Sequence, residues 1–173
     1  MPKTKVAIVK GPDKPNENEI DSMVRKAIEL AGGLASLVSR GDTVIIKPNL
    51  VYPMAPETGA TTDPRICKAI ADIVKELGAK PIIGESSLVS IDTEKVFEVA
   101  DYGRLRKEGY EVIDLKKKGI ERVEVSIPKG KALKKVILPK IVVDADLIIS
   151  VPKMKTHDSA KVTLSLKLSL IHI

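Results

Sequence analysis

Cysteine and aromatic residues are scarce in this chain of 173 residues, and each shortage excludes a class of protein. Cys67 is the single cysteine, so the chain can form no internal disulfide and cannot by itself supply a cysteine-ligated zinc site or iron–sulfur cluster. Its place in a helical pattern favours burial as a small hydrophobic side chain. With no tryptophan, one phenylalanine and three tyrosines, the chain offers no stacking platform for single-stranded nucleic acid.

Charge and hydropathy add further exclusions. Lys and Arg outnumber Asp and Glu by 29 to 23, a mild excess with local clusters at residues 116–118 and 129–135. Such runs are usually a solvated face, so we expect no nucleic-acid partner. No stretch approaches the roughly 18 apolar residues of a membrane span, and the N-terminus has no apolar signal region. We therefore expect a cytoplasmic protein with no membrane partner.

The last six residues, 168–173, are unusual. Their sequence, Leu-Ser-Leu-Ile-His-Ile, matches the in-frame translation of a transposon mosaic-end adapter used in sequencing libraries. We predict a non-native tail here and a single α/β domain over residues 1–167, truncated at its C-terminal end. The alternative is an ordinary apolar C-terminal strand. Excluding the tail removes His172, and with it any metal site built from two histidines.

Hydrophobic patterning predicts strands that alternate with helices. The best-marked helix has Asp63 as its cap, Pro64 in its first position and Gly78 just past its end. The apolar runs are continuous and rich in β-branched residues, which suits strands buried on both faces. Such alternation predicts a three-layer α/β fold with a mainly parallel, Rossmann-like sheet. The predicted strands are 6–9, 43–46, 81–84, 111–113 and 146–150, and the predicted helices are 20–31, 64–77 and 93–100.

Residues 120–127 follow a different pattern, because apolar and charged residues partly alternate there. This pattern is typical of a half-exposed strand. We predict an antiparallel pair with the run at 136–138, joined through Gly130, as a small hairpin inserted into the α/β domain.

Three of the buried strands run directly into polar loops, at residues 47–49, 84–87 and 150–157. The carboxyl ends of parallel strands share one edge of a sheet, and ligands bind in the crevice there. The three loops should therefore converge, although they are far apart in sequence.

The residue types in these loops indicate an anion, since lysines bring positive charge and hydroxyls bring hydrogen-bond donors. The amino end of the helix that begins at Asp63 would add backbone N–H groups and a favourable dipole. The alternative is purely structural: Asn49 forms a turn, Thr62 or Asp63 only caps the helix, and the lysines are only solvated. The candidate ligand-binding residues are Lys47, Asn49, Thr61, Thr62, Ser86, Ser87, Lys153 and Lys155.

Glu85 and His157 are the candidates for acid–base chemistry. Glu85 directly follows a buried strand and could be a general base, a metal ligand or, as we favour, an ion-pair partner of Lys47 or Lys153. His157 could serve as an acid, a base or a ligand, although a lone loop histidine is more often structural or merely exposed.

Common nucleotide and hydrolase motifs are missing. The chain has no Gly-x-Gly-x-x-Gly after its first strand, no Walker-type loop and no nucleophile elbow.

Four ordered motifs resemble the family known as domain of unknown function 362 (DUF362). They are Val44–Val51, Thr61–Arg65, Gly84–Ser87, and Asp146–His157 followed by Val162–Lys167. Members of that family tend to be about twice as long, and some carry ferredoxin-like segments with four-cysteine iron–sulfur motifs. The resemblance implies no established catalytic residue, and it implies a cluster only in a C-terminal part that this chain lacks.

Two functions of different classes remain. The first is an enzyme domain that binds a small anionic substrate at the carboxyl edge of the sheet, with Glu85 or His157 handling a proton. The second is a non-catalytic scaffold or electron-transfer partner of a ferredoxin-like domain in the same polypeptide, so the cofactor is unknown.

Overall fold

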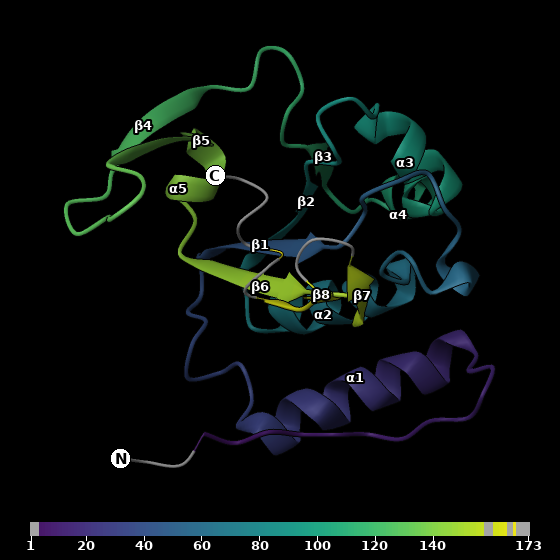
Figure 1. The fold of residues 1–173 in the computed structure, drawn as a ribbon. Helices are drawn as coiled ribbons and strands as arrows, with labels where there is room; N and C mark the ends of the chain where they lie inside the picture. Colours follow the sequence, from purple (N-terminus) through teal and green to yellow (C-terminus); the bar gives the residue numbers. More distant parts are fainter. Residues whose placement is uncertain (1–3, 158–160, 166–167, 169–173) are drawn as a thin grey trace.

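A four-stranded parallel sheet forms the centre of the structure, a computed structural model that describes residues 4–157, 161–165 and 168. Its strands lie in the order β3–β2–β1–β6, and every neighbouring pair is parallel (Figure 1). With helices flanking this sheet and small antiparallel hairpins added to it, the predicted three-layer α/β fold is confirmed. The four strands are β1 (Thr43–Pro48), β2 (Lys80–Glu85), β3 (Val112–Asp114) and β6 (Leu147–Val151).

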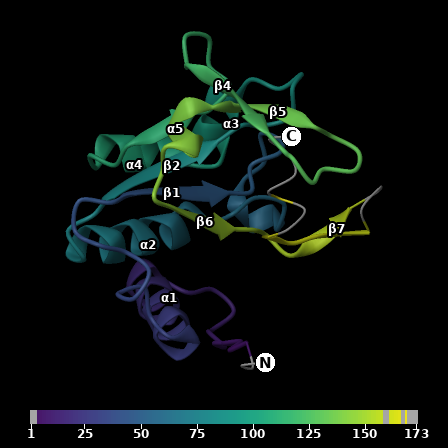
Figure 2. The ribbon, with the colours of Figure 1, turned by 90° about the vertical axis from the view of Figure 1, so that its left-hand side faces the viewer.

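The other elements cover the two faces of this sheet. Helix α2 lies on one face with α1 outside it, whereas the β4–β5 hairpin and α5 lie on the other side (Figure 1, Figure 2). These elements are α1 (Glu17–Ala31), the 3₁₀ turn η1 (Pro56–Thr58), α2 (Pro64–Glu76), α3 (Thr93–Val99), α4 (Tyr102–Lys107), β4 (Arg122–Ser126), β5 (Lys135–Pro139), α5 (Lys140–Val143), β7 (Lys155–His157) and β8 (Lys161–Thr163).

Helix α2 begins as its sequence predicts. The Asp63 side chain accepts a hydrogen bond from the Arg65 backbone N–H at 2.9 Å, and Pro64 occupies the first position. Gly78 follows the helix with a φ of 79°, in the left-handed region that glycine adopts without strain. The apolar stripe of α2, with Ile70 and Val74 buried, packs on the sheet.

The main core lies on the α2 side of the sheet. It joins side chains of β1 and β2 to those of α2, α3 and α4, including the fully buried Phe97 and Tyr102. Cys67 is buried in it as predicted, and burial raises the pKa of its thiol to about 12. The sequences of β1 and β2 are continuous apolar runs because both faces of the sheet are covered along these strands.

The inserted hairpin is confirmed. Strands β4 and β5 pair antiparallel from Arg122 opposite Pro139 to Ser126 opposite Lys135. A Cβ on Gly130 would lie 1.8 Å from the carbonyl oxygen of Leu133, so the turn accepts only glycine there.

The prediction of a strand at residues 6–9 is wrong. This run has no strand pairing among the described residues, and Val6 and Ile8 are 82% and 88% exposed. It runs beside α1 instead (Figure 1), where a Cβ on Gly11 would lie 2.3 Å from Sδ of Met23. High β-propensity does not make a strand without a neighbouring strand to bond with.

Leu168, the first residue of the predicted tail, is buried, and its N–H donates to the Leu164 carbonyl at 2.9 Å. Residues 169–173 of that predicted tail lie outside the described residues.

Candidate functional site

The chain reverses its direction of travel across the sheet between β1 and β6. From β1 it proceeds outward to β2 and then β3, and it returns through the hairpin to β6 on the other side of β1. In open α/β sheets such a switch point opens a crevice at the carboxyl ends of the two strands. The loops after β1 and β6 flank this place, which makes it the first position to search for a ligand site.

Thr62 joins the ends of β1 and β6. Its hydroxyl donates to the Val151 carbonyl at 2.7 Å and accepts from the Asn49 backbone N–H at 2.9 Å. The Thr62 N–H in turn donates to the Asn49 carbonyl at 3.1 Å. The predicted convergence of these loops is therefore real, and Thr62 holds them together.

Glu85 joins the ends of β1 and β2. Its carboxylate accepts from the Lys47 ammonium at 2.8 Å and from the backbone N–H groups of Leu50 at 2.9 Å and Ser86 at 2.7 Å. The Lys47 and Glu85 side chains are only 5% and 2% exposed. The favoured ion pair is confirmed, with Lys47 as the partner, and it neutralises the charge that Lys47 would bring to an anion.

Two more of the predicted hydroxyl donors bind backbone carbonyls. Ser87 donates to the Leu50 carbonyl at 2.7 Å and Thr61 to the Met54 carbonyl at 3.0 Å. Ser87, like Thr62, thus joins two loops, whereas the Thr61 bond closes the loop between β1 and α2 on itself. Ser86 is only partly buried and its hydroxyl has no hydrogen bond to the described residues.

The first N–H groups at the amino end of α2 are bonded to Asp63. The Asp63 carboxylate accepts a hydrogen bond from the Arg65 N–H, and the Asp63 carbonyl accepts one from the Ile66 N–H at 3.1 Å. Burial acts to raise the pKa of Asp63, but hydrogen bonds from Arg65 outweigh this and lower it. The Asp63 carboxylate also forms an ion pair with the Arg65 guanidinium at 2.6 Å, so the two charges compensate each other, and a role of this helix end in anion binding stays a prediction.

Three buried polar atoms at the switch point have no hydrogen-bond partner among the described residues. They are Nδ2 and Oδ1 of Asn49, whose side chain is 0% exposed, and Oγ of Ser150. Ser150 lies opposite Lys47 in the register of β1 and β6, and Asn49 follows Lys47 by two residues. Buried polar groups are nearly always bonded, so this group requires an explanation. Ser150 was not among the predicted site residues, because only the pairing register shows its position.

Lys153 and Lys155, which follow β6, contact residues 59 and 60 in the loop that precedes α2. Lys155 donates to the Ala60 carbonyl, and a Cβ on Gly59 would lie 4.0 Å from Cε of Lys153. The positive charge of Lys153 also contributes to lowering the pKa of Asp63. Lys153 forms no ion pair within 4.0 Å in the described part of the chain, so its charge is available to a ligand.

His157 lies in β7, opposite Lys161 of β8, and is partly exposed. It shares one side of that strand with Lys155, because side chains alternate along a strand. Within the described residues no group of three or more His, Cys, Asp or Glu side chains could hold a metal ion.

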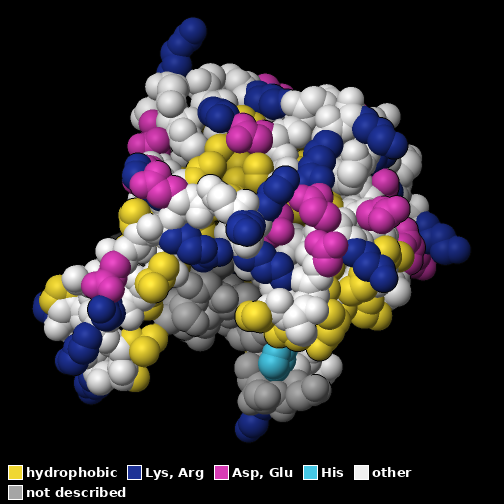
Figure 3. All heavy atoms as spheres, turned by 90° about the horizontal axis from the view of Figure 1, so that it is seen from above, with side chains coloured by type: hydrophobic (Ala, Val, Ile, Leu, Met, Phe, Trp, Pro, Cys, Tyr) yellow, Lys and Arg dark blue, Asp and Glu magenta, His cyan; other side chains and the backbone are white. Residues whose placement is uncertain are grey.

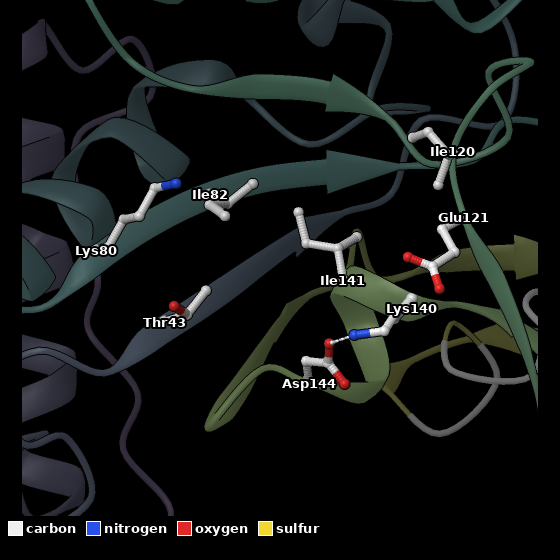
Figure 4. A pocket seen from close by; sticks show the side chains of 8 residues that line it. All are labelled: Thr43, Lys80, Ile82, Ile120, Glu121, Lys140, Ile141 and Asp144. Carbon is white, nitrogen blue, oxygen red and sulfur yellow. Dashed lines mark hydrogen bonds and ion pairs between the residues drawn. The ribbon is translucent and has the colours of Figure 1, made fainter.

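A pocket of about 420 Å³ lies elsewhere, over the amino ends of β1 and β2 (Figure 4). Ile82 and Ile141 line it together with Thr43, and its rim carries the Lys140–Asp144 ion pair at 2.5 Å. This edge is opposite to the polar loops, and its charged groups neutralise each other. We therefore do not assign the site to it.

The fold and these loops define a three-layer α/β domain with a polar cluster at a topological switch point. The chain belongs to the DUF362 family: the family described as "Domain of unknown function (DUF362)" matches residues 44–172. The resemblance predicted from the sequence motifs is thus confirmed.

The chain is also similar to a thylakoid-associated protein of Synechocystis, with 29% identity over 148 residues. The match covers 83% of this chain and 43% of the relative, so the chain spans less than half of that protein's length. No solved structure matches the chain.

Proposed function

We propose that the carboxyl edge of the sheet binds a small anionic molecule, as part of an enzyme. The observation that carries this proposal is the group of unpartnered polar atoms of Asn49 and Ser150 at the switch point between β1 and β6. An unbonded buried amide costs stability, on the order of 1–3 kcal/mol. A ligand that bonds to it would offset that cost.

The contacts of the other residues narrow the proposed ligand site. Asn49 and Ser150 supply neutral hydrogen bonds, Lys153 supplies the charge, and Ser86 and Lys155 flank them. Other predicted residues act one step further out. Thr62, Ser87 and the Lys47–Glu85 pair fix the loops to one another, and Thr61 stabilises the loop between β1 and α2. Because Asn49 offers both a donor and an acceptor, the ligand that fits best carries a carboxylate or phosphate beside a hydroxyl or amide.

Proton transfer in such an enzyme falls to His157 rather than Glu85. Three donors occupy the Glu85 carboxylate, and the side chain is enclosed. The ring of His157 is partly exposed and belongs to the same segment as Lys153. The alternative is the second function predicted from the sequence, a scaffold or electron-transfer partner of a ferredoxin-like domain, in which the cluster would be held by that other domain.

The cytoplasm is the location that we propose. The described residues contain no helix long and apolar enough to cross a membrane. The name of the Synechocystis relative supports a thylakoid association for this chain as well, and we propose that any such contact is peripheral.

Ligand-induced thermal stabilisation tests the proposed function. Malonate and orthophosphate serve as probes, and we expect at least one to raise the Tm of the chain in a saturable way. Lys153→Ala should reduce this shift at least severalfold, whereas Lys95→Ala, at an exposed lysine of α3, should leave it unchanged. No shift with either probe, or equal losses in both variants, would contradict an anion site at this edge.

A further inference from the structure

The β4–β5 hairpin projects from the body of the molecule. We call residues 122–139 the lysine hairpin; its two strands are joined by residues 127–134. It stands away from the central sheet in two perpendicular views (Figure 1, Figure 2). From above it forms a separate lobe at the lower left, on which basic and hydrophobic side chains lie side by side (Figure 3).

The charge of the lysine hairpin is one-sided. Residues 122–139 contain four lysines and one arginine against a single acidic residue, Glu124. Lys129 and Lys131 are exposed and form no ion pair with the described residues, while Lys134 donates to the Gly130 carbonyl and Lys135 pairs with Glu124 at 2.7 Å. The tip therefore presents at least two uncompensated positive charges on a tight turn.

Two apolar side chains of the lysine hairpin are exposed. Leu133, between Lys131 and Lys134, is 48% exposed, and Ile137, opposite Glu124 in the strand register, is 62% exposed. Single exposed apolar residues are common. An exposed leucine between two lysines on a projecting element is less common, and basic residues interleaved with apolar ones match the chemistry of an anionic bilayer surface.

We infer that the lysine hairpin attaches this protein to the surface of a membrane that contains anionic lipids. The lysines contact the headgroups, and Leu133 enters the interface between headgroups and acyl chains. This departs from the expectation of no membrane partner, which rests on the lack of spanning helices and of a signal region. Nucleic acid fits less well, because the lysine hairpin has no aromatic residue to stack on bases.

Vesicle co-sedimentation of the 173-residue chain tests the inference. The probes are unilamellar vesicles of phosphatidylcholine alone and of phosphatidylcholine with 30% phosphatidylglycerol. We expect binding to the anionic vesicles only, with a loss at higher salt because exposed charges are screened. The double variant Lys129→Glu/Lys131→Glu should weaken it at least tenfold.

A matched control separates the lysine hairpin from net charge. Lys95→Glu/Lys107→Glu makes the same charge change at exposed positions of α3 and α4, and it should reduce binding far less. Leu133→Ser should weaken binding severalfold, whereas Val89→Ser, at a residue 95% exposed in a loop, should not. Unfolding temperatures show that the variants remain folded.

Three results would overturn the inference. The first is the absence of binding to the anionic vesicles. The second is an equal loss in both charge-reversal variants. The third is tighter binding to duplex DNA or to an acidic peptide such as polyglutamate than to vesicles at the same salt, which would make the partner another class of molecule.

Discussion

Asn49 is the residue that most directly separates a ligand site from a structural loop. Its backbone is fully used, because the N–H and carbonyl both bond Thr62, yet its side-chain amide has no partner in the described chain. A residue selected only for a turn would point its amide to solvent or to the backbone. The turn interpretation considered from the sequence therefore explains the Asn49 backbone but not its side chain.

Replacing the Asn49 amide with an apolar group of similar size should not cost stability. We expect Asn49→Leu to leave the free energy of unfolding unchanged or to raise it by about 1 kcal/mol, because an unbonded buried amide is removed. The same change at Asn16, which caps α1 through a capping box, should lower it by about 1 kcal/mol. Urea denaturation measures both. A loss above about 1 kcal/mol at Asn49 would show that its amide is bonded in the native state.

The Lys47–Glu85 pair gives a second residue-scale prediction. Lys47→Met leaves a buried carboxylate without its counter-charge, which typically costs about 3–5 kcal/mol. Adding Glu85→Gln removes that charge, so the double variant should be more stable than Lys47→Met alone. Urea denaturation at neutral pH compares them. Additive losses would show that the two side chains do not interact in solution.

At the scale of elements, helices and strands were predicted correctly where the local sequence pattern was strong. Helix α2 carries a cap, a proline and a glycine at the expected places, and β1, β2 and β6 are continuous apolar runs. Residues 6–9 have the same apolar character but no strand beside them, and the short α4, α5 and β7–β8 leave no periodic signal to read. Local sequence indicates what a segment can form, while its neighbours decide whether it does.

In the candidate site too, local sequence predicted some features, while others depend on contacts between distant segments. The strand-end loops could be found because the carboxyl ends of parallel strands share one edge. The individual roles could not, since Thr62 and Ser87 are ordinary hydroxyl residues until their carbonyl partners are known. Ser150 was missed because its significance depends on the pairing of β6 with β1.

Asp63 supports an element-scale prediction about α2. Its pKa is lowered in the folded state, against a burial contribution that raises it, by the hydrogen bonds from Arg65. Because its pKa is lower in the folded state, the ionised Asp63 carboxylate stabilises the fold fully at pH values above 3.8, the ordinary pKa of the group. This contribution is lost as the pH falls through the folded-state pKa. Asp63→Asn, which keeps a capping side chain, should therefore lower stability modestly at pH 7 and reduce the additional loss below about pH 4.

Thermal unfolding between pH 7 and pH 3 measures this difference. Asp63→Ala serves as the comparison, because it also removes the cap and should cost about 1 kcal/mol at pH 7. If Asp63→Asn and the unsubstituted chain lose stability in parallel down to pH 3, the Asp63 carboxylate does not contribute to acid unfolding.

At the scale of the whole molecule, the polar edge and the lysine hairpin are separate features of one domain. The polar edge lies at the carboxyl ends of β1 and β6, while the lysine hairpin projects from the opposite sheet face to α2. The matched relative is more than twice as long as the region it shares with this chain. We propose that the remainder of such longer proteins completes the enzyme around the ligand site.

The most direct test of the central claim is the side-chain amide region of a ¹H–¹⁵N NMR spectrum. The chain has no glutamine and only three asparagines, Asn16, Asn18 and Asn49, so three NH₂ pairs are expected there. On titration with malonate or orthophosphate, we predict that the Asn49 pair shifts in a saturable way. The pairs of Asn16, which caps α1, and Asn18, in its first turn, should stay in place. An Asn49 pair that does not move, or three pairs that move together, would contradict a ligand site at the switch point.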